Sequence, residues 1–350
     1  MADSAGIEIR NLYKIFGPKA AEMLELVRAG MSKTELNERH GHVLGLDDIN
    51  ITMTGGRIQV IMGLSGSGKS TLIRHINRLI DPTAGQVLAG DEDVTAMGPD
   101  ALRAFRRHKT AMVFQKFALL PNRTVLENTA YGLEIQGIAR GRREAVAMRW
   151  IERVGLAGYE RRYPNQLSGG MQQRVGLARA LANDAPILLM DEAFSALDPL
   201  IRVDMQSVLL DLQREVRKTI VFITHDLDEA LRLGDSIAIL RDGRVVQQGT
   251  SQEIVLNPAD DYVASFVREV NRGRVIHAET AMRALEGEDA AGAATLPGKA
   301  TLEEAMRAMN ATSADRLIVV EEGGQPIGIL TSDAIIAAMV GPAEAAAAQA

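Results

Sequence analysis

Residues 58–71 read I-Q-V-I-M-G-L-S-G-S-G-K-S-T, an apolar run that opens into a glycine-rich turn. A continuous apolar run of this length is typical of a strand buried on both faces, as in a parallel sheet. The residues that follow fit the pattern G-x-x-x-x-G-K-[ST], and a helix is expected directly after them. A strand, a glycine-rich loop and a helix in this order predict a phosphate-binding site in an α/β fold.

The residue types of this loop indicate its chemistry. Its glycines let backbone N–H groups turn toward a β-phosphate, and the N-terminus of the following helix adds a favourable dipole. We expect Lys69 to contact the β- and γ-phosphates and the Ser70 hydroxyl to bind Mg²⁺. The loop residues assigned to the nucleotide are Gly63, Leu64, Ser65, Gly66, Ser67, Gly68, Lys69, Ser70 and Thr71.

A second buried strand ends in two carboxylates. Residues 187–192 read ILLMDE, and open α/β sheets bind their ligands at the carboxyl ends of their strands. Asp191 is expected to hold the Mg²⁺ shell. Glu192 is the candidate general base that orients and polarises the attacking water, a role worth roughly 10²–10⁴-fold in rate.

Strand and helix patterns alternate along the first part of the chain, which predicts an α/β fold with a largely parallel sheet. Further buried strands are expected at 110–114, 187–191 and 219–224, and helices at 142–154, 169–183 and 200–217. We also expect residues 7–16 and 47–53 to form an antiparallel pair near a sheet edge. Strands at 236–240 and 244–248 should form a hairpin around Asp242-Gly243.

A helical insertion separates the first two strands. Within 18–43, apolar residues recur at helical spacing from Ala20 to Val27, and Gly30 should end that helix. Ser32 and Glu35 have the spacing of a capping box, which predicts a second short helix.

The composition limits the class of protein. A length of 350 residues suggests two domains, and 46% hydrophobic with 24% charged residues is globular composition. The net charge of −6 and the lack of a long Lys/Arg block argue against nucleic acid as a partner. The absence of cysteine excludes disulfides and thiolate metal sites, and it fits a reducing compartment.

We expect the chain neither to enter nor to span a bilayer. Nowhere do about 20 apolar residues run uninterrupted, which is the length a spanning helix needs. The stretch from Met1 to Arg10 carries Asp3 and Glu8 and does not have the pattern of a signal peptide.

The residue composition of the sequence changes after Arg268. Residues 286–298 are rich in Ala, Gly and acidic residues, which is typical of a linker. Residues 301–340 predict a helix, a strand (RLIVV), a turn at Gly323-Gly324, a strand (IGIL) and a final helix. The Ala-rich residues 343–350 are expected to be a flexible tail.

Residues 167–174, LSGGMQQR, resemble the signature motif of ATP-binding cassette (ABC) proteins. Ser168 can cap a helix whose first N–H groups are left bare by glycines, which makes a second anion cradle. The resemblance implies that this cradle meets the γ-phosphate held by another subunit, so that ATP lies between the two chains of a homodimer. The signature residues assigned to ATP are Ser168, Gly169, Gly170 and Gln172.

The resemblance also implies the architecture of the first domain. It would be an ABC-type nucleotide-binding domain over residues 1–270, with a mostly parallel sheet core and an antiparallel edge sheet. Its helical subdomain would span about 116–183.

Further elements of this family appear in the expected order. Gln115 resembles the lid glutamine, which also faces the Mg²⁺, and Ser195-Ala196-Leu197-Asp198 resembles the aspartate loop, with Asp198 at the nucleotide. His225 resembles the switch histidine that donates to the γ-phosphate and the attacking water. The five other histidines are interpreted as structural: His40, His42, His75, His108 and His277.

The family stacks adenine on an aromatic residue near the end of the first strand. Phe16 stands at the matching place in residues 11–17, NLYKIFG, and Tyr13 is the alternative. Because stacking needs only a π face, residue type alone does not separate the two.

Three segments, 11–17, 62–71 and 190–202, resemble the ATPases of glycine betaine/proline importers, a similarity that covers about residues 7–270. Ala193 fits this branch, since many import cassettes have proline there. The resemblance implies a peripheral ATPase on the cytoplasmic face of the plasma membrane. Its partners would be integral membrane permease subunits, which Gln115 and residues 117–121 would face, and a periplasmic or extracellular substrate-binding protein. Choline, proline betaine and trimethylamine oxide are solutes of close cousins.

Residues 271–342 resemble a single or truncated cystathionine-β-synthase-type (CBS) repeat, with 274–285 as a remnant of a first one. Residues 328–333, GILTSD, have one residue fewer between Thr331 and Asp333 than nucleotide-binding CBS motifs. We therefore rank this α+β unit first as a dimerisation surface and second as a regulatory sensor.

Two other classes compete with a transport ATPase. A non-enzymatic regulator would bind nucleotide without useful hydrolysis, and the presence of Glu192 and His225 argues against it. A soluble cassette ATPase acting on nucleic acid or ribosomes is disfavoured by the acidic balance of the chain.

Overall fold

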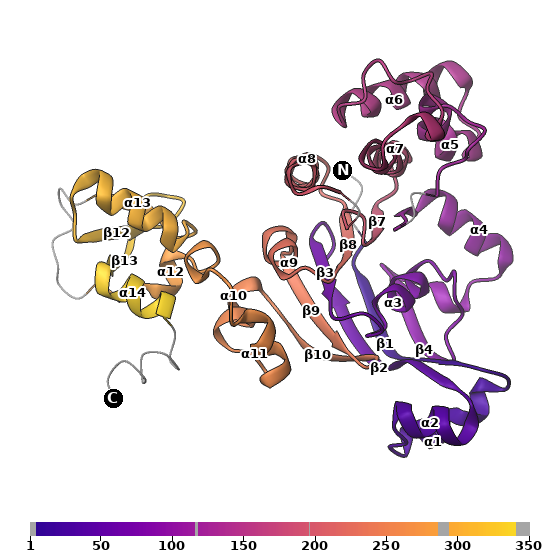
Figure 1. The fold of residues 1–350 in the computed structure, drawn as a ribbon, viewed down its shortest axis with the longest axis horizontal. Helices are drawn as coiled ribbons and strands as arrows, with labels where there is room; N and C mark the ends of the chain where they lie inside the picture. The colour runs from indigo at the N-terminus through magenta and orange to yellow at the C-terminus, as the bar shows by residue number, and fades with distance from the viewer. Residues whose placement is uncertain (1–4, 116–117, 196, 286–293, 341–350) are drawn as a thin grey trace. The chain divides into compact units, whose positions relative to one another are not determined.

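The structure is a computed structural model that describes residues 5–115, 118–195, 197–285 and 294–340. The chain divides into two compact units, Met1–Gln248 and Gly249–Ala350 (Figure 1). Within the described ranges, no helix combines the length and the apolar character that crossing a bilayer requires.

A six-stranded sheet forms the centre of the N-terminal unit. Its strands β3, β6, β7, β8 and β9 are parallel, so their carboxyl ends meet at one edge of the sheet. The strand order is β10 (Arg244–Gly249), β9 (Ser236–Arg241), β3 (Ile58–Met62), β8 (Thr219–Thr224), β7 (Ile187–Asp191) and β6 (Thr110–Val113). The buried strands expected at 110–114, 187–191 and 219–224 are confirmed. The strands of the expected hairpin at 236–248 are confirmed as the neighbours β9 and β10.

A second, four-stranded sheet is antiparallel. Its order is β2 (Val43–Met53), β1 (Ile7–Phe16), β4 (Ala84–Ala89) and β5 (Glu92–Asp93). Strand β1 pairs with β2 from Ile7 opposite Met53 to Phe16 opposite Val43, which confirms the expected antiparallel pair. Because β2 is the outer strand, this pair also lies at a sheet edge.

The two sheets share one hydrophobic core with α3 (Lys69–Ile76) and α4 (Pro99–His108). Side chains alternate along the central strands, so that Val221 of β8 packs into this core. The next residue, Phe222, faces the opposite side and packs on Phe194 with ring centroids 5.4 Å apart. Helices α8 (Pro199–Val216) and α9 (Leu227–Leu233) lie on that opposite side (Figure 1).

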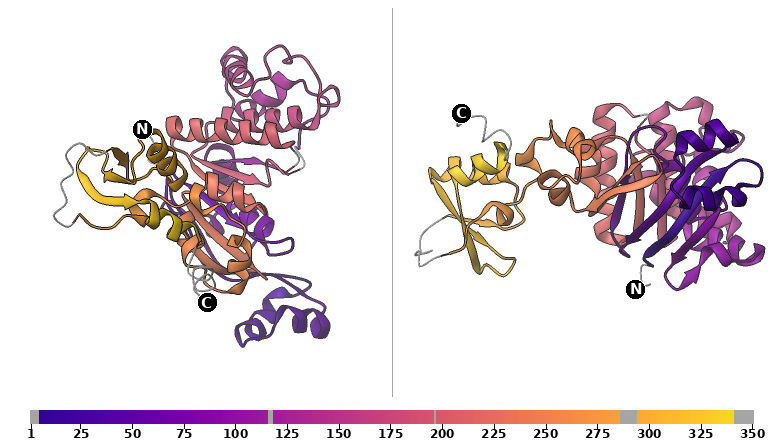
Figure 2. Two further views of the ribbon diagram at one scale, coloured as in Figure 1. Left: turned by 60° about the vertical axis from the view of Figure 1, so that its left-hand side comes forward. Right: turned by 90° about the horizontal axis from the view of Figure 1, so that it is seen from below.

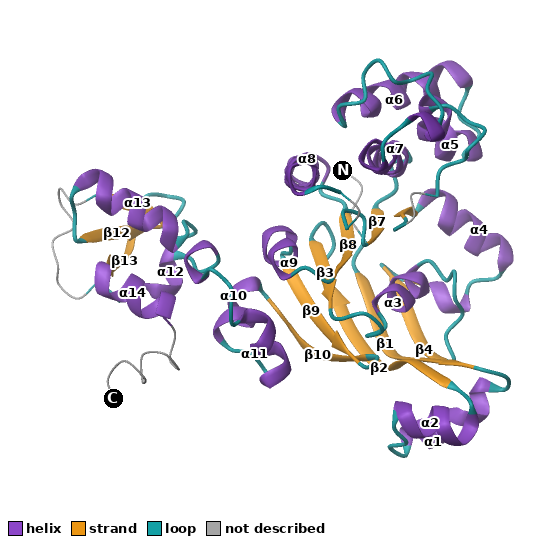
Figure 3. Cartoon of the chain, viewed as in Figure 1, coloured by secondary structure: helices purple, strands orange, loops and turns teal. Residues whose placement is uncertain are grey.

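Three helices form a group of their own, α5 (Val125–Ile135), α6 (Arg140–Arg153) and α7 (Gly169–Ala182) (Figure 3). They confirm the helices expected at 142–154 and 169–183. The short 3₁₀ turn η3 (Pro164–Gln166) directly precedes the signature residues, and another, η2 (Val94–Ala96), follows β5. Residues 116–117, at the expected start of this subdomain, are outside the described residues.

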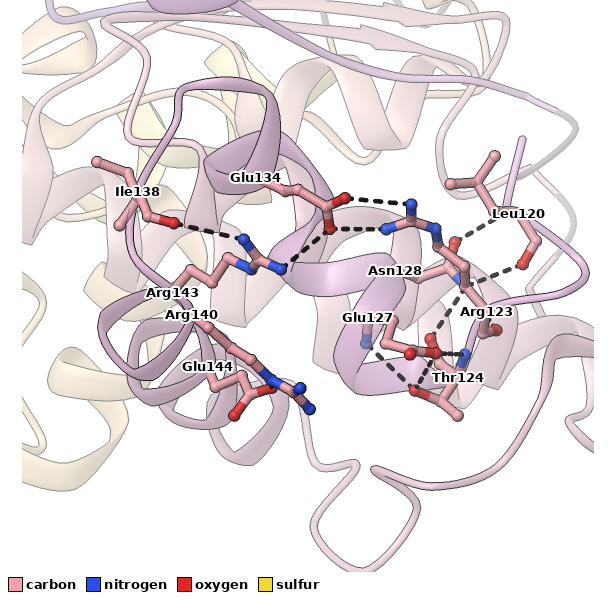
Figure 4. A network of polar contacts seen from close by, with 10 residues as sticks. All are labelled: Leu120, Arg123, Thr124, Glu127, Asn128, Glu134, Ile138, Arg140, Arg143 and Glu144. Atoms are coloured by element: carbon pink, nitrogen blue, oxygen red, sulfur yellow. Dashed lines mark hydrogen bonds and ion pairs between the residues drawn. The ribbon is translucent and has the colours of Figure 1, made fainter.

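Polar contacts hold the segment before α5 in place (Figure 4). The Asn128 side chain accepts a hydrogen bond from Leu120 N at 2.8 Å and donates to the carbonyl oxygens of Leu120, Arg123 and Thr124. Arg123 and Glu134 form a two-bonded ion pair, at 2.8 and 3.2 Å. Residues 120–124 are therefore fixed to the body of α5.

The insertion between β1 and β2 contains η1 (Ala20–Met23), α1 (Leu24–Arg28) and α2 (Lys33–His40), which lie beyond the ends of the two strands (Figure 2). Ser32 and Glu35 form the expected capping box. Val27 and Leu36 pack with Tyr13 in a small core of their own. The insertion is thus a folded element attached to β1.

The C-terminal unit is built around the three-stranded sheet β11-β12-β13. Its elements are α10 (Ser251–Leu256), α11 (Asp261–Val267), η4 (Arg272–Arg274), α12 (Ala278–Ala281), β11 (Thr295–Pro297), α13 (Leu302–Thr312), β12 (Arg316–Val320), β13 (Pro326–Thr331) and α14 (Ser332–Val340). The helix-strand-strand-helix order expected over 301–340 is confirmed. The tail at 343–350 and most of the linker are outside the described residues.

Contacts divide the chain at Gln248/Gly249, earlier than the expected domain boundary at 270/271. The reason is that α10 packs within the C-terminal unit. The Gln252 side chain bonds to His277 and Thr280, and Leu256 packs against the apolar core that contains Ile276. Residues 274–285, expected as a remnant of a first repeat, contribute Ile276 and Ala278 to this same core.

His75 should make the stability of the fold pH-dependent. Its Nδ1 lies 2.7 Å from the Thr71 carbonyl oxygen, and Nε2 is buried with no partner among the described residues. Burial lowers the pKa of His75 to about 4, whereas an unfolded chain has a histidine pKa of about 6.5. Between these values the unfolded chain binds a proton that the folded chain does not. The His75 contribution to the free energy of unfolding, up to about 3 kcal/mol, is therefore lost as pH falls from about 6.5 to about 4.

Urea unfolding at pH 7.5, 6 and 5 tests this, with His75→Leu compared to the wild type. The wild type should lose more stability than the variant over this range, and His108→Gln, at an exposed position, should follow the wild type. Equal losses in wild type and His75→Leu would contradict the assignment.

Candidate phosphate and nucleotide site

The carboxyl ends of β3, β7 and β8 carry the phosphate loop, the two carboxylates and His225 to the same edge of the sheet. A cavity of about 600 Å³ opens there. Its lining residues come from the loop, the strand ends and the insertion: Phe16, Lys33, Val43, Leu44, Gly45, Leu64, Ser65, Gly66, Gly68, Lys69, Ser70, Thr71, Gln115, Glu192 and His225. The structure thus brings Phe16, the loop and all three expected catalytic residues together.

The phosphate loop approaches its neighbours so closely that two of its positions require glycine. A Cβ at Gly63 would lie 2.3 Å from the carbonyl oxygen of Leu240, and one at Gly68 would lie 2.7 Å from that of Gly45. Both glycines also have positive φ, 152° and 103°. Close backbone packing therefore requires glycine at these two positions of the loop.

Lys69 is the first residue of α3 and is buried. Its Nζ donates to the carbonyl oxygens of Gly63, at 2.6 Å, and Leu64, at 2.9 Å. Burial lowers the pKa of Lys69, while the nearby charges of Glu192 and Asp191 act in the opposite direction. The ammonium group is thus held inside the loop, where the expected phosphates would lie.

Ser70 and Asp191 meet at the expected metal position. The Ser70 hydroxyl donates to Asp191 Oδ1 at 2.8 Å, and Asp191 is 1% exposed. Arg74 lies 3.4 Å from Asp191 Oδ2 and partly compensates this buried charge. A hydroxyl beside a carboxylate supplies the hard oxygen ligands that Mg²⁺ prefers when substrate phosphates complete its shell, so the residues fit this ion.

Glu192 is oriented by two partners. Gln115 Nε2 donates to Glu192 Oε2 at 2.8 Å, and His225 Nδ1 lies 3.8 Å from the same oxygen. The backbone of Glu192 is in the left-handed region, with φ 46°, which is strained for a residue with a side chain. The two contacts to Glu192 Oε2 bring all three expected catalytic side chains together in the cavity.

The structure separates the two aromatic candidates for adenine stacking. Phe16 lines the cavity and is 39% exposed, with Lys14 Nζ 5.0 Å from the centre of its ring. Tyr13 is 8% exposed and packs into the insertion core with Val27. A base could reach the ring of Phe16 but not that of Tyr13.

The signature residues lie elsewhere on the chain. Ser168 caps α7, because its Oγ accepts from Met171 N at 3.3 Å, which confirms the expected cap. The Gln172 amide donates to the carbonyl oxygens of Pro164 and Leu167 and so holds this turn. None of the expected signature residues, Ser168, Gly169, Gly170 and Gln172, is among the described residues that line the cavity.

Asp198 likewise lies outside the cavity lining. It caps α8, with Oδ1 accepting from Ile201 N at 3.0 Å. Ala196, in the same expected loop, is outside the described residues.

Five contributors to the site were missed by the sequence analysis. They are Lys33 from the insertion, Val43, Leu44 and Gly45 from β2, and Arg74 from α3. A Cβ at Gly45 would lie 2.7 Å from the Phe16 ring, so this glycine makes room for it. Arg74 could have been found, since it lies one helical turn after Ser70 on the same helix face.

Family models match two parts of the chain, the ABC transporter model at residues 46–195 and the CBS domain model at 292–341. The glycine betaine transport ATP-binding protein OpuAA of Bacillus subtilis is 54% identical over 80% of this chain and 67% of its own length. The glycine betaine/proline betaine protein ProV of Salmonella typhimurium is 47% identical, covering 95% and 82%. The trimethylamine N-oxide protein TmoW of Ruegeria pomeroyi is 46% identical, covering 93% and 94%.

A protein of known structure shares the fold of about two thirds of this chain. The dimeric structure of MJ0796, a bacterial ABC transporter cassette, is 33% identical to this chain with a TM-score of 0.61. The match covers 70% of this chain and 98% of that one.

If Phe16 stacks on the base, its π face should matter more than its bulk. We expect Phe16→Leu to weaken ATP binding about tenfold, since base–aromatic stacking is worth about 1–3 kcal/mol. Phe16→Tyr should keep the wild-type affinity. Isothermal titration with ATP measures both, and equal affinities for the Leu variant and the wild type would contradict stacking on Phe16.

Proposed function

The chain belongs to the ABC transporter family, among the ATP-binding proteins of betaine and related transport systems, and from this membership we propose what it energises. It hydrolyses ATP to drive uptake of glycine betaine, proline betaine or a related quaternary amine through a separate permease. The observation that carries the proposal is the convergence of the phosphate loop, Glu192, His225 and Gln115 on one cavity. The similarity to ProV and TmoW covers 95% and 93% of this chain, so it extends beyond the ATP site to the region of the CBS domain model.

The residues of the cavity divide the work of binding ATP. The phosphate chain follows the loop from Leu64 to Thr71, with Lys69 at the β- and γ-phosphates and the base on Phe16. The Ser70 and Asp191 oxygens would hold Mg²⁺, which neutralises charge on the β- and γ-phosphate oxygens. Gln115 donates to Glu192, and its side chain would lie between the bound Mg²⁺ and the attacking water.

Hydrolysis needs a water molecule in line with the bond between the β- and γ-phosphates. Glu192 accepts a hydrogen bond from this water and takes up its proton as the water oxygen attacks the γ-phosphorus, and the proton then passes to the released phosphate. The bond to the bridging oxygen breaks, which leaves ADP and inorganic phosphate. His225 donates to a γ-phosphate oxygen and stabilises the charge that develops there.

The site of one chain is half of a complete one. Ser168 and Gly169 are exposed and Gly170 and Gln172 half-buried at the start of α7, and none of the four is among the described residues that line the cavity of their own chain. In a homodimer, the same residues of a second copy would close the cavity over the γ-phosphate through the Ser168 hydroxyl and the N–H groups at the start of α7. Asp198, exposed at the start of α8, would lie at this junction.

Glu192→Gln should trap the dimer with ATP bound. The amide keeps the size of the side chain and can still accept the Gln115 hydrogen bond, but it is a far weaker base. We expect turnover to fall by at least about 100-fold while ATP binding persists. Phosphate release and light scattering in Mg²⁺ and ATP measure turnover and dimerisation, and Glu152→Gln, at an exposed position, is the matched control. Normal turnover in Glu192→Gln would contradict the mechanism.

The permease contact is assigned to Gln115 and residues 117–121, of which Phe117 is outside the described residues; the segment leads into the group of helices α5, α6 and α7. Asn128 fixes 120–124 to α5, so a displacement of this segment is transmitted to the helices (Figure 4). A charged cavity of about 380 Å³ lies beside it, with Arg123 and Glu134 in its wall. A permease segment seated there would couple closure of the ATP site to movement in the membrane.

This partnership also gives the location. A permease that is energised by cytosolic ATP places the subunit at the cytoplasmic face of the plasma membrane, bound peripherally. The substrate-binding protein would act on the other side, in the periplasm or outside the cell, and would reach this chain only through the permease.

The C-terminal unit is assigned first to dimerisation with a second copy of itself. Met306 of α13 and Ile336 of α14 are exposed apolar residues, at 38% and 58%, and pairing would remove them from water. Regulation is the second role. The short spacing from Thr331 to Asp333 disfavours an adenosine ligand.

The solute is identified by ATPase activity of the subunit alone and with its co-expressed permease and substrate-binding protein. Glycine betaine, choline, proline and trimethylamine oxide are compared, and we expect glycine betaine to stimulate hydrolysis severalfold in the complex only. Stimulation by trimethylamine oxide instead would favour the second candidate, which the similarity to TmoW supports. Hydrolysis indifferent to any permease would leave a soluble ABC ATPase.

A further inference from the structure

A lysine of the insertion reaches the phosphate loop. Lys33 Nζ donates to the Gly66 carbonyl oxygen at 3.3 Å and lies 3.8 Å from Asp242 Oδ1. Its side chain is 38% exposed and lines the same cavity as Phe16 and Lys69. This cation comes from outside the cassette motifs, 33 residues before the loop residue that it contacts.

The helix that carries Lys33 does not explain its charge. Lys33 is the first residue of α2, where the helix dipole disfavours a cation. The cap of this helix is already complete, since Ser32 accepts from Glu35 N and Glu35 accepts from Ser32 N. The Asp242 contact is long and exposed, and such pairs stabilise a fold little.

The position of Lys33 is set by a folded element. His42 lies 2.6 Å from the Pro18 carbonyl oxygen and so joins the two ends of the insertion. Leu36 anchors α2 in the core shared with Tyr13 and Leu44. The backbone of Lys33 is therefore held by the folded insertion, which directs the ammonium group at the loop.

Lys33 and Lys69 use the loop in the same way. Each ammonium donates to loop carbonyl oxygens, Lys69 to Gly63 and Leu64 and Lys33 to Gly66. Lys69 is buried inside the loop, whereas Lys33 is at its exposed side. A phosphate chain following this loop would lie within reach of both.

We propose that Lys33 is a further nucleotide-binding residue, whose ammonium contacts the phosphates of bound ATP from the insertion side. The inference rests on the proposed ATP site and adds to it a contact supplied by the insertion. A nucleoside di- or triphosphate is the ligand, because a flexible primary ammonium recognises phosphate as a point charge.

Lys33→Gln tests this in the full-length chain. We expect the KM for ATP and the inhibition constant of ADP to rise together, about three- to tenfold, with kcat within about twofold of the wild type. Lys33→Arg should restore most of the affinity. Lys19→Gln, which removes an exposed lysine of the same insertion that pairs with Glu22, should match the wild type.

Asp242→Asn distinguishes a direct contact of Lys33 with the phosphates from a structural role of Lys33 at the turn that contains Asp242. If Lys33 acted only by bracing the turn at Asp242, this variant would raise KM as Lys33→Gln does; we expect it to leave KM unchanged or lower it, because the lysine is released toward the phosphates. Equal KM values for wild type and Lys33→Gln would overturn the inference while leaving the ATP site intact. A wild type without measurable ATP binding would instead overturn the proposed function, and with it this contact.

Discussion

Close backbone packing around the phosphate loop is the constraint on which the N-terminal unit depends. Gly45 of β2 and Gly243 of the β9–β10 turn both approach the loop, since a Cβ at Gly68 would lie 2.7 Å from the Gly45 oxygen and 3.5 Å from the Gly243 Cα. Gly243 N donates to Ser67 O at 3.0 Å, and Asp47 N donates to Gly243 O at 2.8 Å. These contacts join the two sheets at the phosphate loop. The site and the fold are therefore held by the same interactions.

Buried charge at this point has to be compensated within the unit. Asp191 and Lys69 are both almost fully buried, which costs several kcal/mol per ion unless partners are present. Ser70 and Arg74 contact Asp191, and loop carbonyl oxygens accept from Lys69. The polar groups are thus positioned before any ligand arrives, so little reorganisation is needed on binding.

The arrangement also supports the proposed homodimer. One chain brings its phosphate loop, Glu192 and His225 together, but Ser168 and Gly169, exposed at the start of α7, are not among the described residues that line its cavity. The hydrogen bonds of Asn128 join residues 120–124 to the same group of helices. Movement of this group would then affect both the partner's ATP and the permease.

Much of this protein was determined by local sequence. The strand-loop-helix order around Lys69, the carboxylates after β7 and the capping box at Ser32 depend on neighbouring residues, and the structure contains each where it was predicted. The choice between Phe16 and Tyr13 depended on tertiary structure. Alternate residues of a strand face opposite sides, and the insertion builds a core on the side of Tyr13, which leaves Phe16 for the cavity. Lys33 was undetectable for the same reason, since only the docking of α2 on β1 and β2 brings it to Gly66. Contacts between residues far apart in the chain follow from packing, which no local pattern encodes.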